Sequence, residues 1–178
     1  MGYEIAGGLG IKMADPTRDV YVLVGDGSYL MLAQEIITSI QEGYKLIIVL
    51  INNDGHSSIG GLSQATGAQG FATRFRYRDD TGELSGEILP VDLAANAESL
   101  GANVIEATTT QSLKAALQEA RESDRTTVVK IDVDFDVRVP QYESWWDVPV
   151  AEVSEVDTAK QAFEEYKEAK QKERYFLG

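Results

Sequence analysis

A single carboxylate, Asp26, lies between two glycines directly after an apolar run at residues 20–24. A second apolar run, at residues 46–51, is followed by Asn53 and Gly55. Carboxylate, amide and carbonyl oxygens are the ligands of Mg²⁺, which typically takes few protein groups together with substrate phosphates. A glycine beside the carboxylate lets a phosphate approach the backbone, and the N–H groups that open a helix favour an anion. These residues could therefore hold a metal-bound diphosphate.

Such a site forms only if the fold brings the two strand ends together. Both apolar runs are typical of strands in a parallel sheet that is covered on both faces. Apolar residues on one helical face predict a helix over residues 28–42, which Gly43 ends. Strand, helix and strand make a crossover unit whose parallel strands end at one edge of the sheet, where ligands bind. Asp26 and Asn53, 27 positions apart, are therefore expected to be neighbours in space.

The rest of the chain alternates between helical and strand patterns, which predicts an α/β fold, a three-layer sandwich with a mainly parallel central sheet. We expect helices over residues 2–14, 91–100, 112–122 (opened by Thr110) and 154–172, and strands over residues 103–107 and 127–133. Residues 52–89 predict one long loop, which is usually functional or mobile at this length. We expect a single domain over residues 1–178, in which residues 139–178, with Trp145 and Trp146, form a tail that packs on the domain or on a neighbouring subunit.

The composition excludes several classes of site. The net charge of −13 argues against nucleic acid as a partner, because phosphate binding needs a basic surface. The absence of cysteine excludes disulfides, thiolate metal sites and cysteine nucleophiles. No segment approaches the roughly 18 apolar residues of a membrane span and no signal peptide is visible, so we expect no membrane partner and a cytoplasmic location. No GxGxxG follows the first strand, which disfavours a dinucleotide-binding domain.

Each part of the pattern has a plain alternative, because GDG or Asn-Asn after a strand is usually a turn. The joint pattern is rarer, and GDGS…INN resembles the motif of thiamine diphosphate-dependent enzymes. The resemblance implies a thiamine diphosphate-binding fold, with thiamine diphosphate and Mg²⁺ as cofactors. It implies that the side chains of Asp26 and Asn53 and the carbonyl of Gly55 bind the metal. The cofactor-binding residues implied are Met1, Gly25, Asp26, Gly27, Ser28, Asn53, Gly55, His56 and Ser57.

Three members of this set have implied roles of their own. Gly27 and Ser28 would contact the diphosphate. Met1, 25 residues before Asp26, takes the position of the apolar residue that wedges under the cofactor in these enzymes.

Three longer segments carry a more specific resemblance. MGYEIAGGLGIKMA, INNDGHSSIGGLSQ and PQYESWWDVPVAEVS are similar to the C-terminal third of the trihydroxycyclohexane-1,2-dione hydrolases of myo-inositol degradation. The resemblance implies hydrolysis of a carbon–carbon bond, which opens a polyhydroxylated cyclic dione to a 5-deoxy-hexuronic acid. An acetolactate synthase-like or decarboxylase-like domain, and a cofactor-binding module without catalysis, stay open as alternatives. Gly-His-Ser-Ser at residues 55–58 disfavours the first two, which often have a bulky residue and a carboxylate there.

The same resemblance implies partners for the chain. In this family a glutamate from a separate N-terminal, pyrimidine-binding domain activates the cofactor, usually across a subunit boundary. No acidic residue here is assigned that role. We therefore expect the chain to be the C-terminal cofactor domain of a larger homo-oligomeric enzyme, a fragment with no turnover of its own.

Two further features have a plain and a functional interpretation. His56, the only histidine, is by default a loop residue, but its ordinary pKa of about 6.5 would suit a general acid or base near a dione. Arg74, Arg76 and Arg78 alternate with aromatic residues. We favour a solvated loop or edge strand for them over recognition of substrate hydroxyl groups or a subunit contact.

Overall fold

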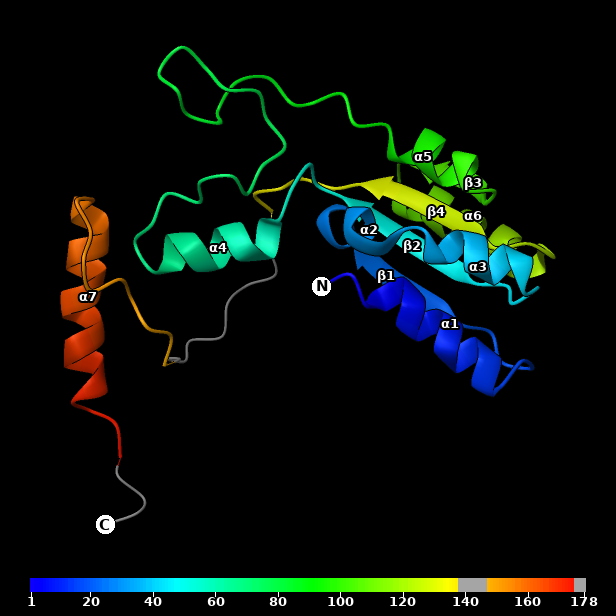
Figure 1. Cartoon of the computed structure of the whole chain (residues 1–178), viewed down its shortest axis with the longest axis horizontal. Helices are drawn as coiled ribbons and strands as arrows, with labels where there is room; N and C mark the ends of the chain where they lie inside the picture. The colour runs from blue at the N-terminus through cyan, green and yellow to red at the C-terminus, as the bar shows by residue number, and fades with distance from the viewer. Residues whose placement is uncertain (138–146, 175–178) are drawn as a thin grey trace. The chain divides into compact units, whose positions relative to one another are not determined.

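A computed structural model of the chain describes residues 1–137 and 147–174 (Figure 1). It divides into two compact units. The first consists of Met1–His56 and Ile88–Val137, and the second of Ser57–Glu87 and Arg138–Gly178.

The first unit is built on a four-stranded parallel sheet with the order β1-β2-β4-β3. The strands are β1 (Tyr21–Gly25), β2 (Ile47–Asn52), β3 (Asn103–Ala107) and β4 (Thr127–Asp132). Their bounds agree with the predicted runs to within a residue or two at each end. The predicted adjacency of the first two runs is confirmed, because Val24 pairs with Leu50 and Gly25 with Ile51.

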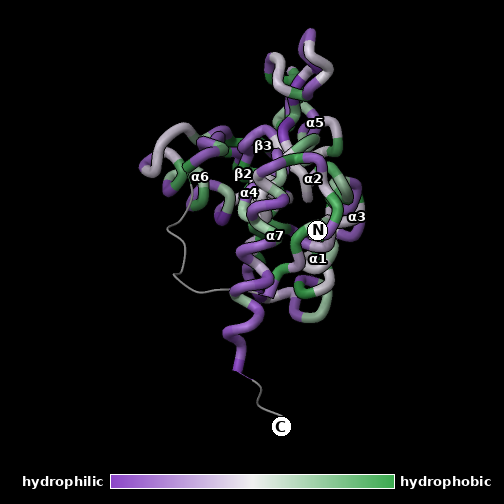
Figure 2. Tube along the Cα trace, turned by 90° about the vertical axis from the view of Figure 1, so that its left-hand side faces the viewer, coloured by the Kyte–Doolittle hydropathy of each residue, from purple (hydrophilic) through white to green (hydrophobic). Residues whose placement is uncertain are grey.

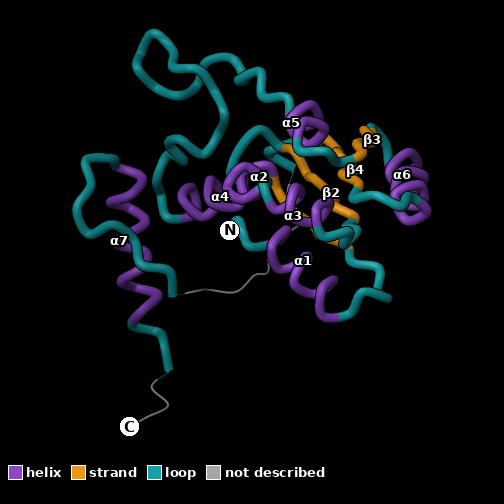
Figure 3. The backbone as a smooth tube through the Cα atoms, turned by 45° about the vertical axis from the view of Figure 1, so that its right-hand side comes forward, coloured by secondary structure: helices purple, strands orange, loops and turns teal. Residues whose placement is uncertain are grey.

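Helices cover the two faces of this sheet as separate layers (Figure 3). One face carries α1 (Glu4–Ala14), α2 (Asp26–Leu32), α3 (Glu35–Gln41) and α5 (Leu93–Ser99), and the other carries α6 (Thr110–Glu122). The larger core lies under the first group and includes Ile5, Tyr29, Ile36, Ile48, Leu50 and Val128. The smaller core lies under α6 and is made of Ile47, Ala107, Ala116, Ala120 and Val129. This arrangement confirms the α/β sandwich expected from the sequence.

The expectation that both early strands are covered on both faces holds for β2 and is wrong for β1. Ile47 to Leu50 are all buried, but Tyr21 and Leu23 on one face of β1 are 44% and 65% exposed. The reason is the position of α6, which packs on β2, β3 and β4 and leaves the outer face of the edge strand uncovered.

Three predicted helices differ from the structure. Residues 28–42 form two helices instead of one: α2 begins at Asp26, and Ala33 and Gln34 separate it from α3. The helix predicted at residues 112–122 is capped by Thr109 instead of being opened by Thr110, because the Thr109 side chain accepts from the Ser112 N–H in a capping box. The helix predicted at residues 154–172 is shorter, α7 (Asp157–Lys170).

The second unit contains an element that the sequence prediction missed. Residues 57–65 of the predicted long loop form α4 (Ser57–Ala65), whose glycines and serines hid it. Gly67 follows it with φ of 79°, and a Cβ there would lie 2.3 Å from the Thr158 carbonyl oxygen of α7. Figure 2 shows α7 as mostly hydrophilic, and of its side chains the structure buries Ala159.

Two arginines of the loop between α4 and α5 bond to the loop itself. Arg76 donates to the Gly86 carbonyl at 2.8 Å, and Arg78 donates to the Gly82 carbonyl. These contacts agree with the plain interpretation of the arginine series. Trp145 and Trp146, with the rest of residues 139–146 and residues 175–178 of the predicted tail, lie outside the described residues. No helix among the residues that the structure describes is long and apolar enough to cross a membrane.

Candidate functional site

The carboxyl ends of β1 and β2 lie side by side and form the centre of the candidate site. Asp26 directly follows β1 and begins α2, and Asn53 directly follows β2. The position of α2 is fixed by Tyr29, which is fully buried and donates a 2.9 Å hydrogen bond to Asn96 Oδ1 in α5. Burial raises the pKa of Tyr29 to about 12, so the phenol stays protonated and keeps this bond near neutral pH.

Asp26 is 1% exposed, and its carboxylate joins the two strand ends. Oδ1 accepts from the Gly27 N–H at 2.7 Å. Oδ2 accepts from the N–H groups of Asn53 at 3.0 Å and Gly55 at 2.9 Å. Three backbone donors thus stabilise a buried negative charge. The neighbourhood of Asp26 and Asn53 that the spacing predicted is confirmed by these bonds.

The side chain of Asn53 has an oxygen that suits a cation. Asn53 Oδ1 is buried and has no hydrogen-bond donor among the residues that the structure describes. Buried polar atoms are normally bonded, and one that is not requires an explanation such as an ion. A carboxylate and an amide oxygen are the kind of hard, partly neutral donors that Mg²⁺ accepts. Among the described residues no three His, Cys, Asp or Glu side chains gather, so a cation here depends on such mixed oxygens.

Gly27 lies directly against the ring of His56. A Cβ on Gly27 would be 2.3 Å from His56 Nδ1 and 2.4 Å from Cε1, so no other residue fits at position 27 without moving the imidazole. Ser28 is half-buried in the first turn of α2. At Gly25 a Cβ would meet nothing within 4 Å among the described residues, which leaves its backbone open to a ligand.

The remaining residues of the predicted set differ in what the structure shows of them. Gly55 meets Asp26 through its N–H; the role of its carbonyl as a metal ligand stays a prediction. Met1 is 63% exposed, and the adjoining Gly2 approaches Met31 of α2, where a Cβ would be 3.1 Å from the Met31 Cβ. Ser57 begins α4 and belongs to the second unit.

A polar network beside Asn53 was missed by the sequence analysis. Asn52, the last residue of β2, donates through Nδ2 to Asp132 Oδ1 at 2.8 Å. Lys130 Nζ lies 3.0 Å from both Asp132 Oδ2 and Glu106 Oε2. Burial lowers the pKa of Lys130, but the hydrogen bonds to the two carboxylates outweigh it and the net pKa is raised. Burial raises the pKa of Asp132, and the bonds from Asn52 and Lys130 reverse this to a net lowering.

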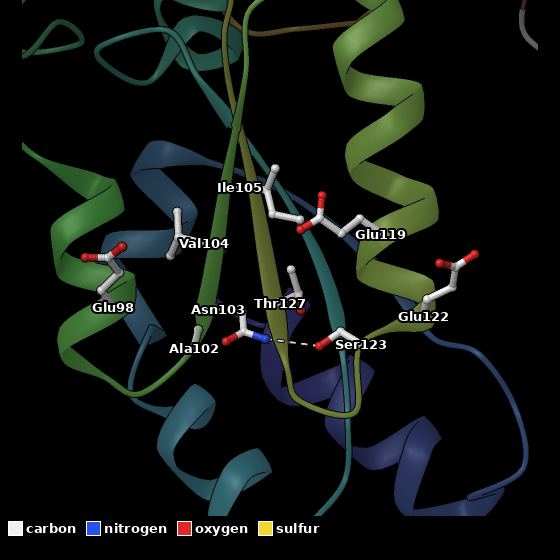
Figure 4. Close-up of a pocket in the computed structure, with 9 residues that line it drawn as sticks. All are labelled: Glu98, Ala102, Asn103, Val104, Ile105, Glu119, Glu122, Ser123 and Thr127. Atoms are coloured by element: carbon white, nitrogen blue, oxygen red, sulfur yellow. Dashed lines mark hydrogen bonds between the residues drawn. The ribbon is translucent and has the colours of Figure 1, made fainter.

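A separate hollow lies at the opposite end of the sheet. It has a volume of about 760 Å³ and includes Asn103 and Thr127, the first residues of β3 and β4 (Figure 4). Glu119 and Glu122 of α6 lie along one side. In a parallel sheet the functional edge is the carboxyl one, so we assign the site to the Asp26 edge.

Comparisons with known proteins identify the family of the chain. Residues 1–131 match the family described as thiamine pyrophosphate enzyme, C-terminal TPP binding domain. A 3D-(3,5/4)-trihydroxycyclohexane-1,2-dione hydrolase of Clostridium botulinum is 44% identical over 94% of this chain and 26% of its own length. A protein of the same name from Bacillus cereus, with the suffix 2, is 42% identical over 92% of this chain and 26% of its own length. The chain thus spans about a quarter of the length of these curated relatives.

A solved structure shares the fold. The Rhodococcus jostii RHA1 thiamine diphosphate-dependent 4-hydroxybenzoylformate decarboxylase superposes with a TM-score of 0.62 at 23% identity, over 76% of this chain and 24% of that one. With the family match over residues 1–131, the chain belongs to the C-terminal thiamine pyrophosphate-binding domains of the thiamine pyrophosphate enzymes.

Proposed function

We propose that this chain is the diphosphate- and magnesium-binding part of a hydrolase that uses thiamine diphosphate to open the ring of trihydroxycyclohexane-1,2-dione, giving a 5-deoxy-hexuronic acid in myo-inositol breakdown. The metal role is supported by Asn53 Oδ1, which is buried without a hydrogen-bond partner among the described residues, and by the buried Asp26 carboxylate, which accepts from the Asn53 N–H. The substrate part is supported by relatives of that name at 42–44% identity over more than nine-tenths of this chain.

In this proposal, different residues of the first unit bind the metal and the diphosphate of the cofactor. Asp26 and Asn53, with the Gly55 carbonyl, hold Mg²⁺. Gly27 and Ser28, in the first turn of α2, receive the diphosphate, and Gly25 lets it approach the backbone. Asp26 gives the site one negative charge, so a divalent cation keeps a net positive charge for the diphosphate. When bound, thiamine diphosphate supplies an electron sink for breaking a carbon–carbon bond.

His56 is the candidate general acid or base of the site. Its ring lies against Gly27, so it is next to the position proposed for the diphosphate. An imidazole can move a proton near neutral pH, which ring opening of a dione requires. Replacing His56 by Ala in the enzyme should therefore reduce kcat more than it weakens cofactor binding.

Other parts of the enzyme complete the pocket in this proposal. The chain spans about a quarter of its relatives' length, and the cofactor's aminopyrimidine end needs a carboxylate partner. We assign that carboxylate to a separate pyrimidine-binding domain, in a homo-oligomer, and expect no turnover from the 178-residue chain alone. Ring opening by the purified chain would contradict this.

The test is calorimetry with thiamine diphosphate, with and without Mg²⁺. Wild type is expected to bind in a Mg²⁺-dependent manner. Asp26→Asn should lose at least about tenfold in affinity, the effect of about 1.4 kcal/mol. Asp19→Asn is the matched control, because Asp19 pairs with Arg121 in an exposed ion pair away from the site. Unchanged affinity in Asp26→Asn would remove Asp26 from the site.

The substrate is tested separately, in the chain joined to the rest of its enzyme. That protein is assayed on the cyclic dione and on pyruvate. Ring opening of the dione supports the hydrolase. Release of carbon dioxide or acetolactate from pyruvate, without ring opening, would support the synthase or decarboxylase alternative.

A further inference from the structure

The turn that carries Asn53 is connected by side chains to the far strands of the sheet. Asn52 and Asp132 are register partners at the carboxyl ends of β2 and β4. Glu106 and Lys130 are register partners one pleat earlier, on β3 and β4. All four residues lie toward the carboxyl ends of their strands, the same end of the sheet as Asp26. Asp26 itself follows β1, the outer strand on the side of the sheet away from β3. The network therefore joins β2, which Asn53 directly follows, to β3 and β4, which contribute no residue to the predicted site.

Asp132 fixes the orientation of the Asn52 amide. An ionised carboxylate only accepts hydrogen bonds, so the NH₂ group of Asn52 must face Asp132 Oδ1, at 2.8 Å. The amide oxygen of Asn52 is thereby turned toward Asp54, whose N–H it accepts at 3.3 Å. The same NH₂ group reaches Asp54 Oδ1 at 3.3 Å. Asp132 and Asp54 thus favour the same orientation of the Asn52 amide, with its oxygen toward the turn.

The turn at Asp54 needs this support. Asp54 has φ of 58°, a left-handed conformation that non-glycine residues adopt at a cost. Its neighbours on both sides, Asn53 and Gly55, point their N–H groups at the same atom, Asp26 Oδ2. A change of backbone direction at Asp54 would therefore separate one or both donors from Asp26 and would move Asn53 Oδ1.

Lys130 holds Asp132 in place and balances its charge. Lys130 is 15% exposed and lies 3.0 Å from each of two carboxylates. The second oxygen of Asp132 is thereby occupied, so the first is left for Asn52. The Lys130 ammonium also offsets negative charge at the carboxyl end of the sheet, where Asp26 and Asp54 lie.

We propose that Asp132, held by Lys130, is a positioning residue that orients Asn52 and so sets the Asn53 oxygen and the two backbone donors for metal–diphosphate binding. This inference rests on the proposed function for its ligand. The support of the turn by Asp132 does not depend on which ligand binds. The two parts can be measured independently.

The first measurement is amide hydrogen exchange by NMR without ligand. In Asp132→Ala the N–H groups of Asn53 and Gly55 should exchange about tenfold faster, the effect of losing one typical hydrogen bond. The Gly27 N–H also donates to Asp26, but from α2, and should stay at the wild-type rate. Asp132→Asn retains an oxygen for Asn52 and should exchange more slowly at these amides than Asp132→Ala. Asp19→Ala, which removes an exposed ion pair with Arg121, is the control.

The second measurement is calorimetry of the same variants with Mg²⁺ and thiamine diphosphate. Asp132→Ala should weaken binding about tenfold, with Asp132→Asn between it and wild type. Unchanged exchange at Asn53 and Gly55 would overturn the positioning role, whatever the affinity. Faster exchange with wild-type affinity would overturn the link to the ligand. A wild type without Mg²⁺-dependent binding contradicts the proposed function, and the exchange data still decide whether Asp132 supports the turn.

Discussion

Replacing Asp26 by Asn changes one atom of the residue that joins the two strand ends. The carboxylate accepts from Gly27 at 2.7 Å, Asn53 at 3.0 Å and Gly55 at 2.9 Å. Asn has one acceptor oxygen and an NH₂ group in place of the second. If the oxygen takes the Oδ2 position, it keeps the bonds from Asn53 and Gly55. The NH₂ group then faces the Gly27 N–H, donor against donor.

The expected loss of stability follows from these bonds. Hydrogen bonds to a charged group contribute about 1.5–3 kcal/mol, and neutral ones about 0.5–1.5 kcal/mol. Two bonds weaken, and the third is replaced by an unsatisfied buried N–H, for a loss of about 3–4 kcal/mol. Asp26 is 1% exposed, so its charge costs desolvation energy when the chain folds. Removing the charge removes that cost and offsets part of the lost stability. We expect a net loss of about 2 kcal/mol, which leaves a domain of ordinary stability folded.

Urea unfolding in the absence of Mg²⁺ measures this effect alone. The unfolding midpoint is compared for wild type, Asp26→Asn and Asp19→Asn. The control changes an exposed ion pair and should cost no more than about 1 kcal/mol. If Asp26→Asn unfolds at the same midpoint as the control, with an unchanged slope, the three backbone bonds do not stabilise the strand ends and our account of the site is wrong.

Two further predictions concern the packing around this site. Gly27→Ala should destabilise the domain by about 1–3 kcal/mol, because the new Cβ would lie 2.3 Å from His56 Nδ1; the double variant Gly27→Ala, His56→Ala should recover most of the unfolding midpoint, and no recovery would rule out the steric explanation. The raised pKa of Tyr29, about 12, makes the folded state lose stability as pH rises from about 10 to 12, with the full contribution present below pH 10. Tyr29→Phe should remove up to about 3 kcal/mol of that alkaline loss, and parallel stability–pH profiles for the two proteins would contradict it.

The sequence could place Asp26 and Asn53 together because both follow strands of a single strand–helix–strand unit. Two apolar runs separated by one crossover must be parallel and can be adjacent, so Asp26 and Asn53 could be placed together without knowing the rest of the sheet. The bonds from Asn53 and Gly55 to Asp26 follow from that adjacency. The break of the predicted helix at Ala33 and Gln34 could not be foreseen, because neither residue is a helix breaker.

The supporting network could not be predicted because it depends on strand order. Asp132 meets Asn52 only because β4, the last strand in sequence, inserts between β2 and β3. Nothing in the pattern at residues 127–133 distinguishes this position from an edge. In the sequence, Asp132 looks like any polar residue at the end of a strand. Its contact with Asn52 can be inferred only once the pairing of β2 and β4 is known.

The buried oxygen of Asn53 affects folding as well as binding. It leaves water when the chain folds, before any cation arrives, and an unbonded buried polar group costs about 1–3 kcal/mol. The cation then need not strip water from this atom, so part of the desolvation cost of binding has already been met by the fold. Linkage makes the relation reciprocal, since a ligand that binds only the folded state stabilises it by an amount that rises with the logarithm of ligand concentration above the Kd. We therefore expect the unfolding midpoint of this domain to rise with the concentration of metal and cofactor.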